Sequence, residues 1–206
     1  MANDEKNTRA ALVQQGRRIE YLSLGWTALE ALVGVWVGLL AGSVALVGFG
    51  ADSLIEIASS AVLIWRLHDH PLSEHRERVA LKLVGIGFLL LAVYVGCEAA
   101  RDLLLREPPK ASIIGIVFSS LCAVVMPLLA RAKRRVAAEL SSRALQADSR
   151  QSDICAYLAV ILLLGLLLNA LLGWWWADPV AALIMVPLIA MEGAKALRGE
   201  ACGCHE

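Results

Sequence analysis

The sequence predicts an all-α fold, an integral membrane bundle of six transmembrane helices with both termini in the cytoplasm. Apolar residues make up 58% of the 206 residues and charged residues 18%, against about 45–50% and about 25% in soluble domains. Mean hydropathy is +0.65, and a soluble chain of this length lacks the interior volume to bury so much apolar surface. The apolar residues also form long runs, and Lys and Arg are distributed unevenly between the ends of those runs.

The apolar runs predict the helices in order. A hydrocarbon core of about 30 Å requires about 20 mostly apolar residues per helix. Six stretches meet this requirement, at residues 19–41, 43–66, 79–100, 111–130, 150–170 and 176–196. Short polar connections separate them, and the longest is a basic run from Arg131 to Arg150. We therefore expect a cytoplasmic N-terminal segment over residues 1–18, a transmembrane domain over 19–198 and a short cytoplasmic tail over 199–206.

The basic residues predict the orientation of the bundle. On the side of the N-terminus lie Lys6, Arg9, Arg17, Arg18, Arg66, Arg76, Arg78, Lys82, Arg131, Lys133, Arg134, Arg135, Arg143, Arg150, Lys195 and Arg198. The other side has only Arg101, Arg106 and Lys110. Because cytoplasmic connections carry the excess of Lys and Arg, both termini are expected in the cytoplasm, with the protein in the cell (inner) membrane. The three tryptophans Trp174–Trp176 then anchor the outer surface.

Several acids lie inside the predicted spans, with no Lys or Arg in the middle of any span to neutralise them. The candidates well inside the bilayer are Glu30, Asp52, Glu56 and Asp153. An ionisable side chain in a span costs about 2.5–3.5 kcal/mol on insertion scales, so each one marks a functional site by default. Such carboxyl groups either stay neutral by protonation or hold an external cation. A site that alternates between these states is a proton-coupled cation site.

Asp52 and Glu56 form the sharpest pair in the sequence. An offset of four residues places both carboxylates on one helix face, one turn apart, where they can bind a single ion. At 1.5 Å per residue, Asp52 lies about 13 Å and Glu56 about 20 Å below the outer boundary. The alternative is that each acid only hydrogen-bonds a Ser or Thr of a neighbouring helix.

The fifth span begins with a polar stripe at helical spacing, formed by Asp148, Gln151, Ser152 and Cys155. Asp153 lies about 140° from Asp148 around a regular helix, so the two cannot both face one ion. Asp153 and Cys155 are expected about 20–22 Å below the outer boundary, level with Glu56. Asp148 is alternatively an N-cap or interfacial acid, and Cys155 a packing residue.

Glu30 in the first span has three open interpretations: a further ligand, a proton carrier or a packing acid. The same span carries Gly34, Gly38 and Gly42 at intervals of four residues. Small residues at this spacing let another helix approach closely, so the stripe predicts tight helix packing.

Two further groups of residues suggest secondary metal binding on the cytoplasmic side. The connection between the second and third spans contains His68, Asp69, His70 and His75, and the tail contains Cys202, Cys204 and His205. Imidazoles and thiols at such spacing bind zinc or softer ions. A solvated polar loop and an inert tail are the alternatives.

The stretch from Ser43 to Glu56 resembles the second helix of the cation diffusion facilitator family, in which Asp or His is followed four residues later by Asp. Here the second acid is Glu56. The six spans, the histidine-bearing and basic connections, and the segments around Asp148 and Asp178 fit the same family. The resemblance covers nearly the whole chain, although the family's large cytoplasmic domain has no counterpart in it.

The resemblance implies a proton-coupled exporter of divalent transition metals, usually zinc, that works as a homodimer by alternating access. Its central site would take Asp52 and Glu56 from the second helix and two ligands from the fifth. Aligned without gaps from Asp148, those two positions are Gln151 and Cys155, whereas a shifted alignment gives Ser149 and Asp153. Neither register has the family's histidine, so Zn²⁺, Co²⁺, Cd²⁺, Mn²⁺ and Fe²⁺ all remain candidate substrates.

Other functions compete with metal export. A proton-coupled exporter of organic cations would use Glu30 or Asp52, with Trp26, Trp36 and Phe49 as aromatic neighbours. A non-transporting membrane protein that binds or senses metal would use the loop histidines and the tail. The sequence has no nucleophile–base or phosphate-loop motif and no excess of basic residues. We therefore expect no enzyme activity, no resident cofactor and no nucleic-acid partner. The expected partners are the lipid bilayer, the metal ion and protons.

Overall fold

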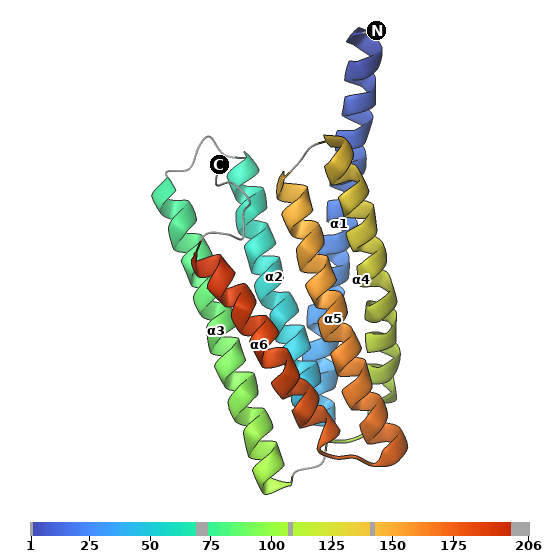
Figure 1. Cartoon of the computed structure of the whole chain (residues 1–206), viewed down its shortest axis with the longest axis vertical. Coiled ribbons are helices and arrows are strands. Elements are labelled where there is room, and N and C mark those ends of the chain that lie inside the picture. Colours follow the sequence, from blue (N-terminus) through green and yellow to red (C-terminus); the bar gives the residue numbers. More distant parts are fainter. Residues whose placement is uncertain (1, 69–73, 107–108, 141–142, 199–206) are drawn as a thin grey trace.

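The computed structural model describes residues 2–198 except 69–73, 107–108 and 141–142. Its six helices confirm the predicted all-α bundle, and the described residues contain no strand. In chain order they are α1 (Ala2–Ala41), α2 (Val44–His68), α3 (Glu74–Leu105), α4 (Ile113–Leu140), α5 (Arg143–Leu172) and α6 (Ala177–Leu197). The helices run alternately in opposite directions, so α1 begins and α6 ends at the same end of the bundle (Figure 1).

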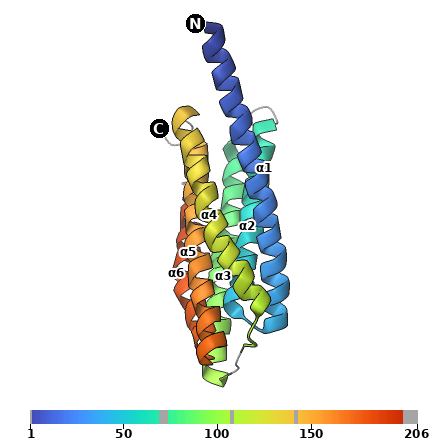
Figure 2. The ribbon, with the colours of Figure 1, turned by 90° about the vertical axis from the view of Figure 1, so that its right-hand side faces the viewer.

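The helices form a closed ring with α2 on its inner side. Contacts run from α1 to α2, to α3, to α6, to α5, to α4 and back to α1. Helix α2 also contacts α5 and α6 across the ring. The first turns of α1 project beyond the other helices (Figure 2). A side chain on the inner face of α2 therefore meets residues from most of the bundle.

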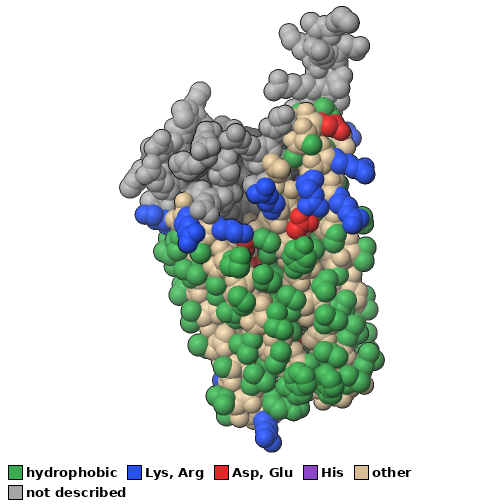
Figure 3. All heavy atoms as spheres, in the orientation of Figure 1, with side chains coloured by type: hydrophobic (Ala, Val, Ile, Leu, Met, Phe, Trp, Pro, Cys, Tyr) green, Lys and Arg blue, Asp and Glu red, His purple; other side chains and the backbone are tan. Residues whose placement is uncertain are grey.

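The outer surface of the bundle suits a bilayer. In the part of the chain that the structure describes, five helices are long and apolar enough to cross a membrane: α1, α3, α4, α5 and α6. Helix α2, with 25 residues, lies between them. Large apolar side chains such as Leu32, Trp36 and Leu90 are about two-thirds exposed, as lipid contact allows. Figure 3 shows this apolar belt between Lys and Arg side chains near each end. The chain is a multi-pass integral membrane protein.

The glycine stripe packs α1 against α2, as predicted. A Cβ added at Gly34 would lie 2.7 Å from the Cα of Gly50, and one added at Gly38 would lie 2.7 Å from the backbone nitrogen of Val47. No side chain fits at either position, so the two helices touch backbone to backbone. Gly42 serves the turn instead, because its φ of +64° is a conformation that favours glycine.

The predicted connection from Arg131 to Arg150 is wrong. Helix α4 continues to Leu140, and α5 begins at Arg143. The reason is that the buried face of α4 does not stop at the end of the apolar run. Val136 and Ala137 are buried, and Ile19 and Leu140 pack against them. The basic residues in this run therefore lie on two packed helices, α4 and α5, and one of these residues, Lys133, is buried in the interior.

The end of the bundle opposite the N-terminus is held by a buried cap. The Ser43 hydroxyl accepts a hydrogen bond from the Leu46 backbone at 3.1 Å and donates one to Asp178 at 2.5 Å. The second oxygen of Asp178 accepts from the Ala45 backbone at 3.4 Å. These bonds satisfy the first amides of α2 and attach its start to α6.

Candidate functional site

Two carboxylates of α2 occupy the interior of the bundle. Asp52 is 2% exposed and Glu56 is 9% exposed, and they lie one turn apart on the helix that contacts α1, α3, α5 and α6. One oxygen of Asp52 has no hydrogen-bond partner. A buried polar atom without a partner is uncommon, and it marks a position where an external group can bind.

Helix α5 supplies a thiol to this pair. The Cys155 side chain is 1% exposed, and its thiol donates a hydrogen bond of 3.2 Å to Glu56. The alignment of the fifth span without gaps predicted Gln151 and Cys155 as its two ligands, and Cys155 does lie against Glu56. Its other residue, Gln151, is half-buried on the same helix. A carboxylate beside a thiol can hold a divalent transition metal once the thiol loses its proton.

Asp153, from the shifted register, faces away from this pair. It forms an ion pair with Arg134 of α4, and both side chains are partly exposed. Ser149 is buried, but its hydroxyl donates to the backbone carbonyl of Gln146 at 2.7 Å. Neither residue of the shifted register is placed beside Asp52 or Glu56 by a described contact.

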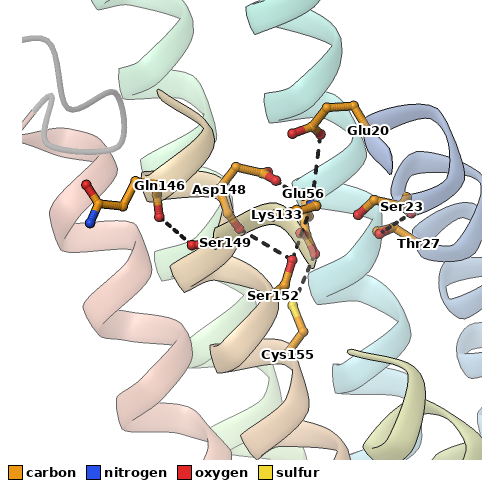
Figure 4. A network of polar contacts seen from close by, with 10 residues as sticks. All are labelled: Glu20, Ser23, Thr27, Glu56, Lys133, Gln146, Asp148, Ser149, Ser152 and Cys155. Atoms are coloured by element: carbon orange, nitrogen blue, oxygen red, sulfur yellow. Dashed lines mark hydrogen bonds and ion pairs between the residues drawn. The ribbon is translucent and has the colours of Figure 1, made fainter. Parts of the chain in front are cut away.

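A second polar cluster lies next to Glu56, toward the end of the bundle where α1 begins (Figure 4). Its centre is Lys133 of α4, which is 1% exposed. The ammonium group forms an ion pair with Asp148, lies 3.9 Å from Glu20 of α1 and donates to the Ser152 hydroxyl at 3.2 Å. Glu56 interacts electrostatically with both Lys133 and Asp148.

Glu30 forms a third buried position on α1. It is 0% exposed, and the indole of Trp26 donates a hydrogen bond of 2.7 Å to one of its oxygens. Its other oxygen has no hydrogen-bond partner. Of the other aromatic residues considered for an organic cation, Phe49 is buried in the core and Trp36 is exposed on the outer surface of α1.

Sequence reasoning missed an acid of α6 near the site. Glu192 of α6 interacts electrostatically with both Asp52 and Glu56. Its carboxylate is 12% exposed and pairs with Lys195 at 2.7 Å. Its position inside the predicted sixth span was a usable signal.

The buried ammonium was also missed, together with its partner Glu20. The basic run was predicted to be a connection between helices, although Met126, Ala130, Lys133 and Ala137 share one helical face. That spacing indicates that the helix continues beyond the apolar run, with Lys133 on its buried face.

The structure contains no preformed metal centre among the residues it describes. Nowhere in that part of the chain do three His, Cys, Asp or Glu side chains come close enough to hold an ion. The proposed secondary sites lie outside it: Asp69, His70, Cys202, Cys204 and His205 are not described, and His68 and His75 stand at helix ends whose side chains are not described.

The chain belongs to the cation efflux family, because residues 21–200 match its transmembrane domain. It is 29% identical to transmembrane protein 163 of Xenopus laevis over 71% of this chain and 53% of that protein. It is 29% identical to an uncharacterised transporter of Synechocystis over 86% of this chain and 60% of that protein. It is 24% identical to the cation-efflux pump FieF of Shewanella oneidensis over 69% of this chain and 49% of that protein.

The chain thus spans about half to three-fifths of the length of these relatives. The matched part runs from the second half of α1 through the end of α6. The family resemblance expected from Asp52 and Glu56 is therefore confirmed.

Proposed function

We propose that this protein exports a divalent transition-metal ion in exchange for protons, by alternating access. The ion binds to Asp52, Glu56 and Cys155 near the middle of the bundle. The single observation that carries this proposal is the burial of Asp52 and Glu56 on the inner face of α2, with one Asp52 oxygen unpaired. Membership of the cation efflux family supports the same conclusion.

The contact between Cys155 and Glu56 suits the protonated form of such a site. Glu56 accepts its hydrogen bond from the thiol of Cys155, and a thiol must release its proton before it binds a metal. Binding of the ion to these ligands therefore releases protons. Lower pH is expected to weaken metal binding, because protons compete for the same ligand atoms. Protons that enter the site from the outside then displace the ion, so an inward proton gradient drives its release to the outside.

The ligand set also supports a preference within the transition metals. Carboxylates accept most divalent ions, whereas a thiolate favours softer ions such as Zn²⁺ and Cd²⁺ over Mn²⁺. The fourth ligand of the ion is supplied by water, by Gln151 or by a movement of Glu192 or Asp148 toward the ion.

The test is metal uptake into proteoliposomes under an imposed pH gradient, with Zn²⁺, Co²⁺, Mn²⁺, Cd²⁺ and Fe²⁺ in parallel. We expect gradient-dependent flux with at least one ion. We expect Asp52→Asn to abolish that flux while the purified protein stays folded, because the amide cannot exchange a proton for a metal ion.

Asp153→Asn is the matched control, since it makes the same chemical change in an acid that pairs with Arg134 outside the cluster. It is expected to keep the flux. Loss of flux in folded Asp153→Asn would instead support the shifted register. Flux of an organic cation but of no metal would support the competing exporter, with Glu30 beside Trp26 as its acid. Asp52→Asn protein that transports metal at the wild-type rate would end the proposal.

The proposal includes the setting in which the transporter works. It places the protein in the cell (inner) membrane with both termini in the cytoplasm, supported by the distribution of Lys and Arg. It also includes a homodimer, which rests on the family resemblance alone. Light scattering of the detergent-purified protein, corrected for bound detergent, distinguishes one chain from two.

A further inference from the structure

We infer that Lys133 is a built-in cation that pairs with Asp148 and closes the path to Glu56 from the end where α1 begins. A substrate cation that arrives from that end reaches Glu56 only after Lys133 has left Asp148. This inference rests on the proposed function for the identity of the arriving ion, but its structural part is testable without transport.

The burial of Lys133 is the first step in the argument. A lysine residue that is 1% exposed is stable in its charged form only when charged and polar partners replace the water around its ammonium group. Asp148 and Ser152 of α5 provide two of these partners, and Glu20 of α1 provides a weaker one at 3.9 Å. Lys133 thus joins three helices at one point (Figure 4).

The place of this point along the bundle is the second step. Asp148 precedes Cys155 by seven residues on α5, which is about 10 Å along a helix axis. Cys155 contacts Glu56, and Glu56 interacts electrostatically with Lys133 and Asp148. The cluster therefore lies directly between the Glu56–Cys155 contact and the end of the bundle.

The balance of charge is the third step. The cluster contains two carboxylates, from Glu20 and Asp148, and one ammonium group. Two acids near the end of the bundle attract a cation, and the ammonium group of Lys133 supplies one positive charge beside them. An arriving divalent ion and Lys133 then compete for the same carboxylate, so departure of the ammonium group accompanies opening of that end.

A neighbouring ion pair shows what is particular to Lys133. Arg134 and Asp153 join the same two helices, α4 and α5, through a pair whose side chains are 44% and 29% exposed. That pair lies on the outside of the bundle, so it does not stand between Glu56 and the end of the bundle where α1 begins. It provides a matched control for loss of one α4–α5 ion pair.

The experiment measures how fast a charged methanethiosulfonate reagent labels Cys155 in the full chain reconstituted in nanodiscs. Cys97, Cys122, Cys202 and Cys204 are replaced by serine, so that Cys155 is the only thiol. Lys133→Gln and Asp148→Asn are each expected to raise the labelling rate by about tenfold or more, because each breaks the ion pair of the buried Lys133 side chain and so shifts the opening equilibrium. Arg134→Gln and Asp153→Asn are expected to leave the rate within about twofold, as exposed pairs contribute little.

A charge exchange guards against an effect of misfolding. The double variant Lys133→Asp with Asp148→Lys restores the pair in reverse and is expected to label more slowly than either single variant. Equal labelling rates in the parent, Lys133→Gln and the exchanged variant would overturn the inference. Faster labelling in the Arg134 and Asp153 controls by the same factor would also overturn it, because any α4–α5 ion pair would then suffice. Neither result depends on metal flux, so the proposed function stands or falls separately.

Discussion

At the residue scale, Cys155 gives the candidate site its chemical character. The family resemblance implies a histidine on the fifth helix, and neither register of this chain has one. The structure instead brings a buried thiol to within 3.2 Å of Glu56. Since a thiolate is a softer ligand than a carboxylate or an imidazole, this residue is expected to determine which metal is preferred.

Replacement of the thiol tests that role. In Cys155→Ser, the hydroxyl can still donate to Glu56, so the fold should persist, but the site then has only oxygen ligands. We expect preference for Cd²⁺ over Mn²⁺ to fall by about tenfold or more, measured from competing fluxes in proteoliposomes. An unchanged ratio of the two fluxes would mean that Cys155 is a packing residue, as the alternative interpretation held.

Lys133 and Asp153 show at the same scale how burial assigns roles to charged residues. Both belong to the basic run or the span beside it. Lys133 is 1% exposed and joins three helices, whereas Asp153 forms a partly exposed ion pair with Arg134. On each helix, a step of one residue turns the side chain by about 100°, and this rotation decides whether it faces inward.

At the element scale, the contact between α1 and α2 positions the two carboxylates. Gly34 and Gly38 bring the backbones together, and Asp52 follows Gly50 on the same helix by two residues. Any change in this contact moves α2 relative to α5, and thus moves Glu56 relative to Cys155.

A pair of identical substitutions in α1 tests the contact. In Gly34→Ala, the new methyl group would lie 2.7 Å from the Cα of Gly50, so we expect a loss of about 1–3 kcal/mol in the free energy of unfolding. The same change at Gly25 meets nothing within 4 Å and is expected to add about 0.5–1 kcal/mol through helix propensity. Thermal unfolding midpoints in one detergent measure both. A Gly34→Ala protein as stable as the Gly25→Ala protein would contradict the tight packing.

At the scale of the whole molecule, the alternation of six helices places the start of α1 and the end of α6 at one end of the bundle (Figure 1). The same end carries most of the Lys and Arg residues. Together these features make the bundle strongly asymmetric along its axis, and that asymmetry is what sets orientation in a membrane.

Reporter fusions test the orientation. A reporter that is active only in the cytoplasm is expected to be active at either end of the chain. The same reporter inserted after Gly173, in the turn between α5 and α6, is expected to be inactive, because that turn lies at the opposite end. Activity at Gly173 with none at the ends would invert the proposed direction of transport but leave the fold unchanged.

Much of this architecture is visible in the sequence because the bilayer imposes it. The thickness of the hydrocarbon core requires long apolar runs, and these runs predicted six helices, although α1 begins earlier, at Ala2, and α4 continues further, to Leu140. The cost of burying charge made Asp52 and Glu56 conspicuous, and a period of 3.6 residues placed them on one face. The glycine stripe predicted close packing because small residues let the backbones of two helices approach closely.

The rest depends on how the helices are rotated and packed, which no local pattern records. The sequence left two registers open for the fifth span, and only packing of α5 on α2 and α4 places Cys155 against Glu56 and turns Asp153 toward Arg134. It likewise presented Lys133 as one basic residue among many, whereas the continuation of α4 to Leu140 buries it beside Asp148. Hydrophobicity determines which segments cross the membrane, but the partners of each buried charge are determined by contacts between residues far apart in the chain.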